Sequence, residues 1–310
     1  MVVPNLVSLE FSRQAIVAGV IVIHFRKKIK PSWTFETRSP NEVIWKLLIS
    51  PSGILAGEER NIENKTGSLF AIDVAKGRIL WRHVTMEEPW WFASEQATDD
   101  TLYVQTFRKP DLPEPKGIIA LNIHDGRERW KQPDLSFLCL DTKGKVYAMR
   151  QGYNRREYFA LDSVTGMISE EFGEDDSEVT TAQNSIVETH DHSYYASSLG
   201  ESEHEYLNQA KSLLREIVSE EDIRGAIDYL EFGRYLIFSY HARIREGLTA
   251  MMQNLLSNEL LILDKNTGDV LFSETLHRET PLPIPDNFFV THQSLIYVKE
   301  KRTIVGVSLP

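Results

Sequence analysis

The chain of 310 residues has a single cysteine, Cys139. No intrachain disulfide can form, so the fold does not depend on an oxidising compartment. Cys139 lies in the apolar run 137–140, and this setting predicts a buried, unreactive thiol.

Sequence signatures of catalysis are also missing. The chain has no Gly-x-Ser-x-Gly motif, no Cys-x-x-Cys motif and no basic, glycine-rich phosphate loop. The sequence therefore favours a protein that is not an enzyme, and we expect no cofactor.

Basic residues are in the minority. Lysine and arginine number 34 against 45 aspartates and glutamates, which gives a net charge of −11. An acidic surface repels phosphate backbones and anionic lipid headgroups, so nucleic acid and membrane surfaces are poor partners. The hydrophobic fraction of 42% is that of a soluble globular protein with a substantial core. We expect a monomer.

No apolar run in the sequence is long enough to cross a bilayer. The longest candidate near the N-terminus, residues 16–25, falls well short of about 20 residues. Its basic residues follow the apolar stretch, which is the reverse of a cleavable secretory signal. We expect residues 1–30 to be a leader or an extra strand, and residues 31–310 to be one domain. A cytoplasmic location is expected, the alternative being a periplasmic or membrane-proximal protein held through residues 16–30.

What the sequence does contain is a repeat. A polar turn followed by a strand that opens with apolar or aromatic residues occurs six times, at intervals of roughly 40 to 60 residues. A period near 40–50 residues built from hairpins is typical of β-propeller blades. The six turns begin at Pro51, Asp99, Lys143, Asp191, Phe232 and His292.

A second hairpin class lies between these turns. A strand ends in Asp or Asn, a glycine follows four residues later, and an aromatic residue closes the next strand. Asp can bond its own backbone, glycine accepts a positive φ, and the aromatic ring can pack between neighbouring blades. The four copies are Asp73-Gly77-Trp81, Asn122-Gly126-Trp130, Asp162-Gly166-Phe172 and Asp264-Gly268-Phe272.

The pattern Ala-Leu-Asp-x-x-x-Gly-x-x-x-Trp resembles the repeat of PQQ-like, quinoprotein-type propellers. The whole chain is similar to an uncharacterised bacterial propeller family of about this length. The resemblance implies an all-β, six-bladed propeller. True quinoprotein dehydrogenases resemble longer, eight-bladed secreted enzymes with a vicinal cysteine pair, so the single cysteine argues against that activity.

Two parts of the repeat are irregular. Apolar residues at helical spacing over 203–219 and over 243–258 predict short helical insertions in blades four and five. The last blade lacks a fourth strand at the C-terminus. We predict that Trp33-Thr34-Phe35 pairs with residues 303–308 and closes the ring, which removes an exposed sheet edge.

Five residues form the predicted ligand site. Trp45, Trp90 and Trp91 open innermost strands, so they should gather toward one end of the axis and floor a pocket, with Glu59 or Arg60 as polar handles. The alternatives are inter-blade packing for the indoles and a salt-bridged strand end for the charged pair.

His190 and His192 form a His-x-His pair that resembles part of a metal site. Their place in the repeat favours an ordinary turn, and we expect no metal.

The leading functional hypothesis is a non-catalytic binding or protein-interaction scaffold. Its partner, a protein or a small molecule, would bind the face that carries the long loops, since rigid repeats commonly bind through such loops. The alternative is a hydrolase or lyase with carboxylates at the axial mouth. The long connections are residues 106–117, 173–183, 200–225, 242–258 and 275–287.

Overall fold

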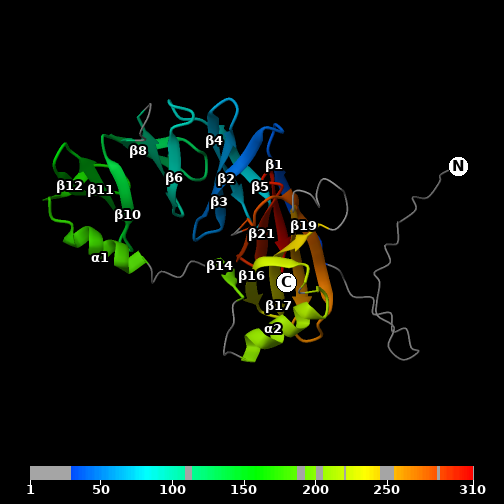
Figure 1. The fold of residues 1–310 in the computed structure, drawn as a ribbon. Coiled ribbons are helices and arrows are strands. Elements are labelled where there is room, and N and C mark those ends of the chain that lie inside the picture. Colours follow the sequence, from blue (N-terminus) through cyan, green and yellow to red (C-terminus); the bar gives the residue numbers. More distant parts are fainter. Residues whose placement is uncertain are drawn as a thin grey trace, which may run out of the picture.

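A computed structural model describes residues 29–108, 114–186, 193–199, 205–219, 221–244, 255–284 and 287–309. Within those ranges the strands form five antiparallel sheets, which we number as blades 1 to 5 (Figure 1). Blades 1 to 3 each contain four consecutive strands in simple meander order, as expected for propeller blades.

Blade 1 consists of β2 (Glu42–Ile49), β3 (Ile54–Asn61), β4 (Thr66–Asp73) and β5 (Arg78–Val84). Blade 2 consists of β6 (Phe92–Ala97), β7 (Thr101–Phe107), β8 (Pro115–Asn122) and β9 (Glu128–Pro133). Blade 3 consists of β10 (Ser136–Leu140), β11 (Lys145–Gln151), β12 (Arg156–Asp162) and β13 (Ile168–Gly173).

Blade 4 consists of β15 (Ser197–Ser198), β16 (Ile223–Phe232), β17 (Tyr235–Arg243), β18 (Leu256–Asp264) and β19 (Val270–Thr280). Blade 5 consists of β14 (Ser193–Tyr195), β20 (Phe288–Thr291), β21 (Ser294–Lys299), β22 (Thr303–Ser308) and β1 (Trp33–Glu36). The described part of the chain also contains the helices α1 (Ser177–Ile186) and α2 (Glu205–Arg215).

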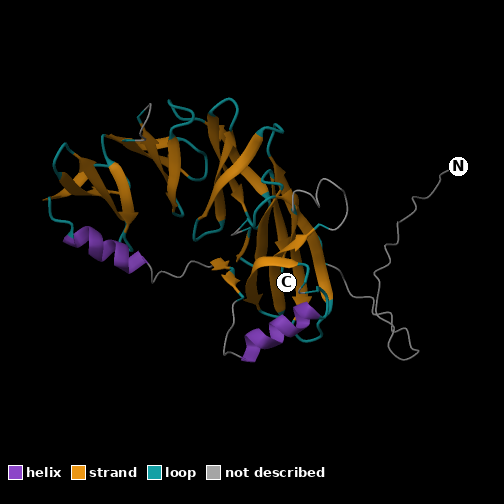
Figure 2. Ribbon diagram, viewed as in Figure 1, coloured by secondary structure: helices purple, strands orange, loops and turns teal. Residues whose placement is uncertain are grey.

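The blades stand side by side in an open arc, with blade 3 at one end and blade 4 at the other (Figure 2). Separate apolar clusters join blade 4 to 5, 5 to 1, 1 to 2 and 2 to 3. Helix α1 packs on the face of blade 3 that is turned away from blade 2, where Val179 and Ala182 contact Tyr147. Helix α2 packs Ala210 and Leu214 against blade 4.

The aromatic–glycine repeat holds the blades together. In blade 1, the Trp81 indole donates its N–H to the carbonyl of Ile123 in blade 2, at 2.7 Å, and lies against Gly126. Trp130 repeats this arrangement on Ser163 and Gly166 of blade 3. The indole fills the space that a β-carbon would need, so only glycine permits this close approach.

The N-terminal strand makes the same contact. Strand β1 pairs with β22, with Trp33 opposite Gly306 and Phe35 opposite Ile304, which confirms the predicted pairing. Trp33 donates to the carbonyl of Val74 at 2.9 Å and covers Gly77 of blade 1. The strand therefore joins blade 5 to blade 1.

The prediction of six blades is not confirmed. Residues 193–195 do not start a blade, because β14 pairs with the inner strand β20 of blade 5, with Tyr194 opposite Val290. After Ala196, β15 pairs with the inner strand β16 of blade 4. The described part of the predicted fourth blade therefore shields the inner edges of two other sheets, and α2 follows it.

Helix α2 confirms the helical insertion predicted over 203–219. The second predicted insertion, 243–258, falls mostly on residues 245–254, outside the described ranges, and Leu256 already belongs to β18. Helix α1 was not anticipated, since residues 173–183 were expected to form a loop. The Asp175 carboxylate accepts the N–H of Ser177 at 3.0 Å and caps this helix.

Candidate functional site

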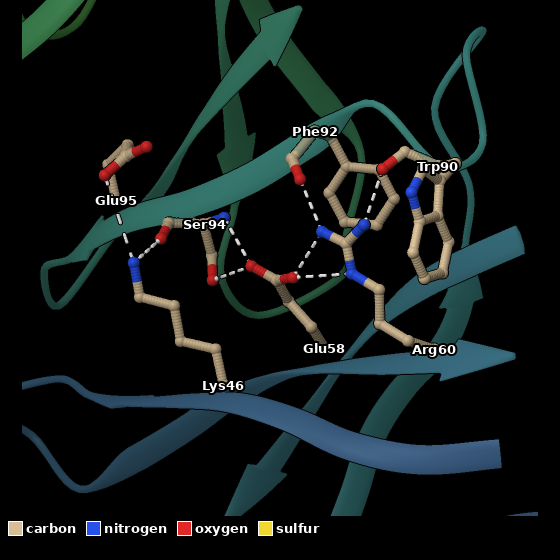
Figure 3. Close-up of polar contacts among 7 residues, drawn as sticks. All are labelled: Lys46, Glu58, Arg60, Trp90, Phe92, Ser94 and Glu95. Atoms are coloured by element: carbon tan, nitrogen blue, oxygen red, sulfur yellow. Dashed lines mark hydrogen bonds and ion pairs between the residues drawn. The ribbon is translucent and has the colours of Figure 1, made fainter. Parts of the chain in front are cut away.

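A buried ion pair links blades 1 and 2 (Figure 3). In β3, the Arg60 guanidinium donates from Nε (3.0 Å) and Nη2 (2.6 Å) to one carboxylate oxygen of Glu58. It also donates to the carbonyls of Trp90, at 2.5 Å, and Phe92 in the next blade. The other Glu58 oxygen accepts the N–H and O–H of Ser94, at 2.6 and 2.7 Å. Both charges are therefore satisfied by protein groups.

Glu59 points to the opposite face of β3, because side chains alternate along a strand. Its carboxylate accepts two hydrogen bonds from Arg82, and Arg82 also donates to the carbonyl of Glu36 in β1 at 2.9 Å. Glu59 thus connects blade 1 to the N-terminal strand. The two predicted polar handles, Glu59 and Arg60, are buried and serve inter-blade contacts.

Trp45 differs from these residues because a β-bulge carries it. The pairing of β2 with β3 passes from Ile44–Glu59 directly to Lys46–Glu58, which leaves Trp45 without a partner. Its side chain is 57% exposed. A bulge redirects a side chain out of the regular alternation, and here it presents an indole to solvent.

The predicted gathering of the indoles is found for Trp45 and Trp90, whose ring centroids lie 6.3 Å apart. The Arg60 guanidinium carbon lies 5.9 Å from the Trp45 ring centroid and 5.2 Å from that of Trp90. Cation–π attraction to both rings, together with the Arg60 hydrogen bonds, therefore holds the Arg60 guanidinium against the two indoles.

Trp91 lies on a neighbouring hollow. Together with Trp90, Asn64, Lys65 and Pro89 it lines a cavity of about 500 Å³ at the junction of blades 1 and 2. The Lys65 ammonium lies 4.9 Å from the Trp90 ring centroid. Trp90 thus separates this hollow from the exposed Trp45.

A second cavity, of about 540 Å³, lies between β2 of blade 1 and the inner side of blade 5; we call it the axial cavity. Trp45 and Leu47 line one side, and Phe289 and Val298 line the other. Tyr195, from the segment that crosses between blades 5 and 4, is also in its wall and is 63% exposed. Its ring centroid lies 5.8 Å from that of Phe289.

The charged groups in the lining of the axial cavity are basic. Lys46 and Lys301 are among the lining residues, and no described residue of the lining is an aspartate or glutamate. Lys46 is engaged, since it donates to the Ser94 carbonyl and lies 3.9 Å from a Glu95 oxygen (Figure 3). Burial raises the pKa of Glu95, although Lys46 opposes this effect. Lys301 is exposed.

One buried polar group in the lining lacks a hydrogen-bond partner among the described residues. The Tyr297 hydroxyl has none, and this residue is 1% exposed. His277 is also buried, and its Nδ1 lies 3.8 Å from a Glu300 oxygen, beyond hydrogen-bond distance. Desolvation lowers the pKa of His277 below its usual value, although Glu300 opposes the shift.

A buried polar network supports the far side of the cavity. Asn287 donates to the side-chain oxygen of Asn258, at 3.1 Å, and to the carbonyl of Ile284, at 2.5 Å. The Ile284 N–H in turn donates to Nε2 of His241, at 3.0 Å. These bonds tie the segment before β20 to blade 4 and hold the cavity wall in place.

The predicted site residues thus separate into two groups. Trp45 lines the axial cavity and Trp90 and Trp91 line the hollow beside it, whereas Glu59 and Arg60 bond to arginine, carboxylate and carbonyl groups of the protein. Sequence reasoning missed Tyr195, His277, Tyr297 and Lys301, since strand patterns alone do not say which strands from distant segments face each other.

His190 and His192 lie outside the described residues, so the metal hypothesis for them stays a prediction. Within the described ranges, no three His, Cys, Asp or Glu side chains are grouped closely enough to hold a metal ion. Among these same residues, no helix has both the length and the apolar character needed to span a membrane.

Comparison with known proteins gives a partial family match. Residues 49–130, which run from the end of β2 to β9, match a family described as a domain of unknown function, DUF4905. A search of curated proteins found no significant match.

Among solved structures, the chain is similar to BamB from Moraxella catarrhalis, with 12% identity, a TM-score of 0.24 and coverage of 90% of this chain and 97% of that one. It is also similar to the Dos1 propeller, with 10% identity, a TM-score of 0.30 and coverage of 86% and 68%. For the tricorn protease the identity is 10%, the TM-score 0.29 and the coverage 85% and 29%. These scores carry no argument about function, which therefore depends on the site itself.

Proposed function

We propose that this protein is a non-catalytic binding scaffold that holds its ligand or partner at the axial cavity. The observation that supports this most directly is the exposure of Trp45 and Tyr195 on the wall of a cavity of about 540 Å³. Binding sites are commonly concave, with apolar and aromatic walls and a few polar groups. Exposed aromatic rings gain free energy when a ligand covers them.

The arrangement of carboxylates supports binding over the hydrolase or lyase alternative. General acid–base catalysis needs a carboxyl group within reach of the substrate. Glu58 and Glu59 are buried, and arginines and Ser94 occupy their oxygens. The described lining of the axial cavity contains no aspartate or glutamate.

The test is calorimetry with a panel of metabolites and short peptides on the wild-type protein and on Trp45→Ala. We expect at least one saturable binding isotherm that Trp45→Ala weakens at least tenfold. Tyr153→Ala is the matched control, because Tyr153 is fully exposed in blade 3, far along the chain from the cavity. Binding that Trp45→Ala leaves unchanged would show that the ligand sits elsewhere.

Tryptophan fluorescence of Trp90→Phe gives an independent check. Trp90 lies behind Trp45 and against Arg60 and Lys65. We expect the ligand-induced change in emission to persist in this variant and to vanish in Trp45→Ala.

A further inference from the structure

The axial cavity has the opposite charge character to the protein around it. The chain carries a net charge of −11, yet the charged side chains that line the cavity are Lys46 and Lys301. We propose that the cavity binds an aromatic group that bears a carboxylate. This inference rests on the proposed binding function and adds the chemical class of the ligand.

The apolar half of the ligand follows from the walls. The exposed Trp45 ring stands on β2, and Phe289 and Tyr195 lie on the blade 5 side. Aromatic rings prefer offset-stacked or edge-to-face contacts with other rings. A planar ring entering between these walls removes from water the aromatic surface that the free protein leaves exposed.

The carboxylate of the proposed ligand is inferred from polar side chains in the cavity lining. Lys301 is exposed and has three ammonium donors, and the Tyr297 hydroxyl is buried without a hydrogen-bond partner among the described residues. Both groups can donate a hydrogen bond, and no described residue of the lining is a carboxylate that competes for them. His277 is set apart from these donors, because its Nδ1 lies 3.8 Å from a Glu300 oxygen. A ligand that presents acceptor oxygens and a negative charge satisfies this set, and hydrogen bonds to charged groups are among the stronger ones.

Two sources supply this chemistry. One is a small aromatic acid, and the other is the C-terminal residue of a protein partner that ends in Trp, Tyr or Phe. The cavity volume of about 540 Å³ is within the range of pockets for molecules of either kind.

The experiment uses pairs of probes that differ only in charge. Indole-3-acetate, phenylacetate and N-acetyltryptophan are titrated against their amides by calorimetry. A second arm compares peptides that end in Trp, Tyr or Phe as the free acid with the same peptides amidated at the C-terminus. We expect every acid that binds to bind at least tenfold more tightly than its amide. The arm that contains the tighter binder shows whether the ligand is a small aromatic acid or the C-terminus of a protein partner.

Two variants test the residues assigned to the carboxylate. We expect Lys301→Gln to raise the Kd of the acid about tenfold and to leave the Kd of the amide unchanged. Lys143→Gln is the matched control, because Lys143 is an exposed lysine in a turn of blade 3. Tyr297→Phe should weaken binding of the acid without lowering the melting temperature, since its hydroxyl has no hydrogen-bond partner among the residues that the structure describes.

The outcomes distinguish the two proposals. Binding that depends on Trp45 but is equal for acids and amides, or is unaffected by Lys301→Gln, overturns the carboxylate inference and leaves the binding function standing. If neither acids nor amides bind, the carboxylate inference is wrong, and the metabolite and peptide panel then decides the binding function. A Tyr297→Phe variant that is destabilised while binding is unchanged shows that the hydroxyl serves the fold.

Discussion

Replacing Arg60 by methionine tests whether the Glu58–Arg60 pair is a structural link between blades 1 and 2. The variant removes both hydrogen bonds to Glu58 and the two to the carbonyls of Trp90 and Phe92. Glu58 is 1% exposed, so its charge would remain buried with only Ser94 as a partner. Breaking a buried pair in this way costs about 3–5 kcal/mol.

The measurement is the free energy of unfolding from urea titration, supported by the melting temperature. For a protein of this size the loss corresponds to a fall of roughly 5–8 °C in melting temperature. Arg155→Met is the control for the same substitution in an exposed ion pair, since Arg155 pairs with Glu157 at 3.1 Å on the surface. It should change the unfolding free energy by about 0.5 kcal/mol or less.

The double variant Glu58→Gln with Arg60→Met separates loss of the ion pair from general damage to packing. Glutamine keeps an acceptor for Ser94 but buries no charge, so the double variant should be more stable than Arg60→Met alone. Two results would refute the reasoning. One is an Arg60→Met protein whose free energy of unfolding lies within about 1 kcal/mol of that of the wild type, which is less than the cost of breaking a buried ion pair. The other is a double variant that is less stable than the single one.

Three further predictions follow from other parts of the fold. Phe35→Ala should cost about 3–5 kcal/mol of unfolding free energy, because Phe35 is buried and stacks on Phe70 at 4.5 Å; a neutral effect would mean that β1 is dispensable. Burial lowers the pKa of His241 below its usual 6.5, with a smaller effect from His277. The stability that neutral His241 contributes should therefore be fully present above pH 6.5 and be lost as the pH falls below it. The variant His241→Gln should reduce this pH dependence of the unfolding free energy, measured by urea titrations at pH 7.5 and 5. Burial also raises the pKa of Cys139 to about 11, so a thiol reagent at pH 8 should react slowly with native protein and fast in urea.

The blade strands and the contacts between blades could be predicted from the sequence because their chemistry is local. Asp73 and Gly77 define a turn by backbone preference, and Trp81 follows at a fixed spacing. The same spacing in successive repeats places an indole on the next glycine, as Trp81 and Gly126 show. The pairing of Trp33 with Gly306 followed from the missing strand in the last blade.

The arrangement of residues 193–198 depends on the tertiary structure. In the sequence, Tyr194 and Tyr195 resemble the start of another hairpin. In the structure, the side-chain hydrogen bond from Ser193 to Thr291 joins this segment to a strand 98 residues away. Local preference cannot specify such a partner, because a short strand fits any free sheet edge and the winning edge depends on loop closure and packing.

The candidate site shows the same division between local pattern and tertiary contact. The sequence alone placed Trp45 at the start of an inner strand, where an aromatic ring can reach the axis. The sequence did not show that Trp45 would be exposed and Arg60 buried. A bulge in β2 exposes Trp45, and the neighbouring blade 2 covers Arg60. The axial cavity exists only where β2, Tyr195 and blade 5 meet. Its walls come from segments far apart in the chain, so burial and partner choice there were decided by the packing of whole sheets against each other.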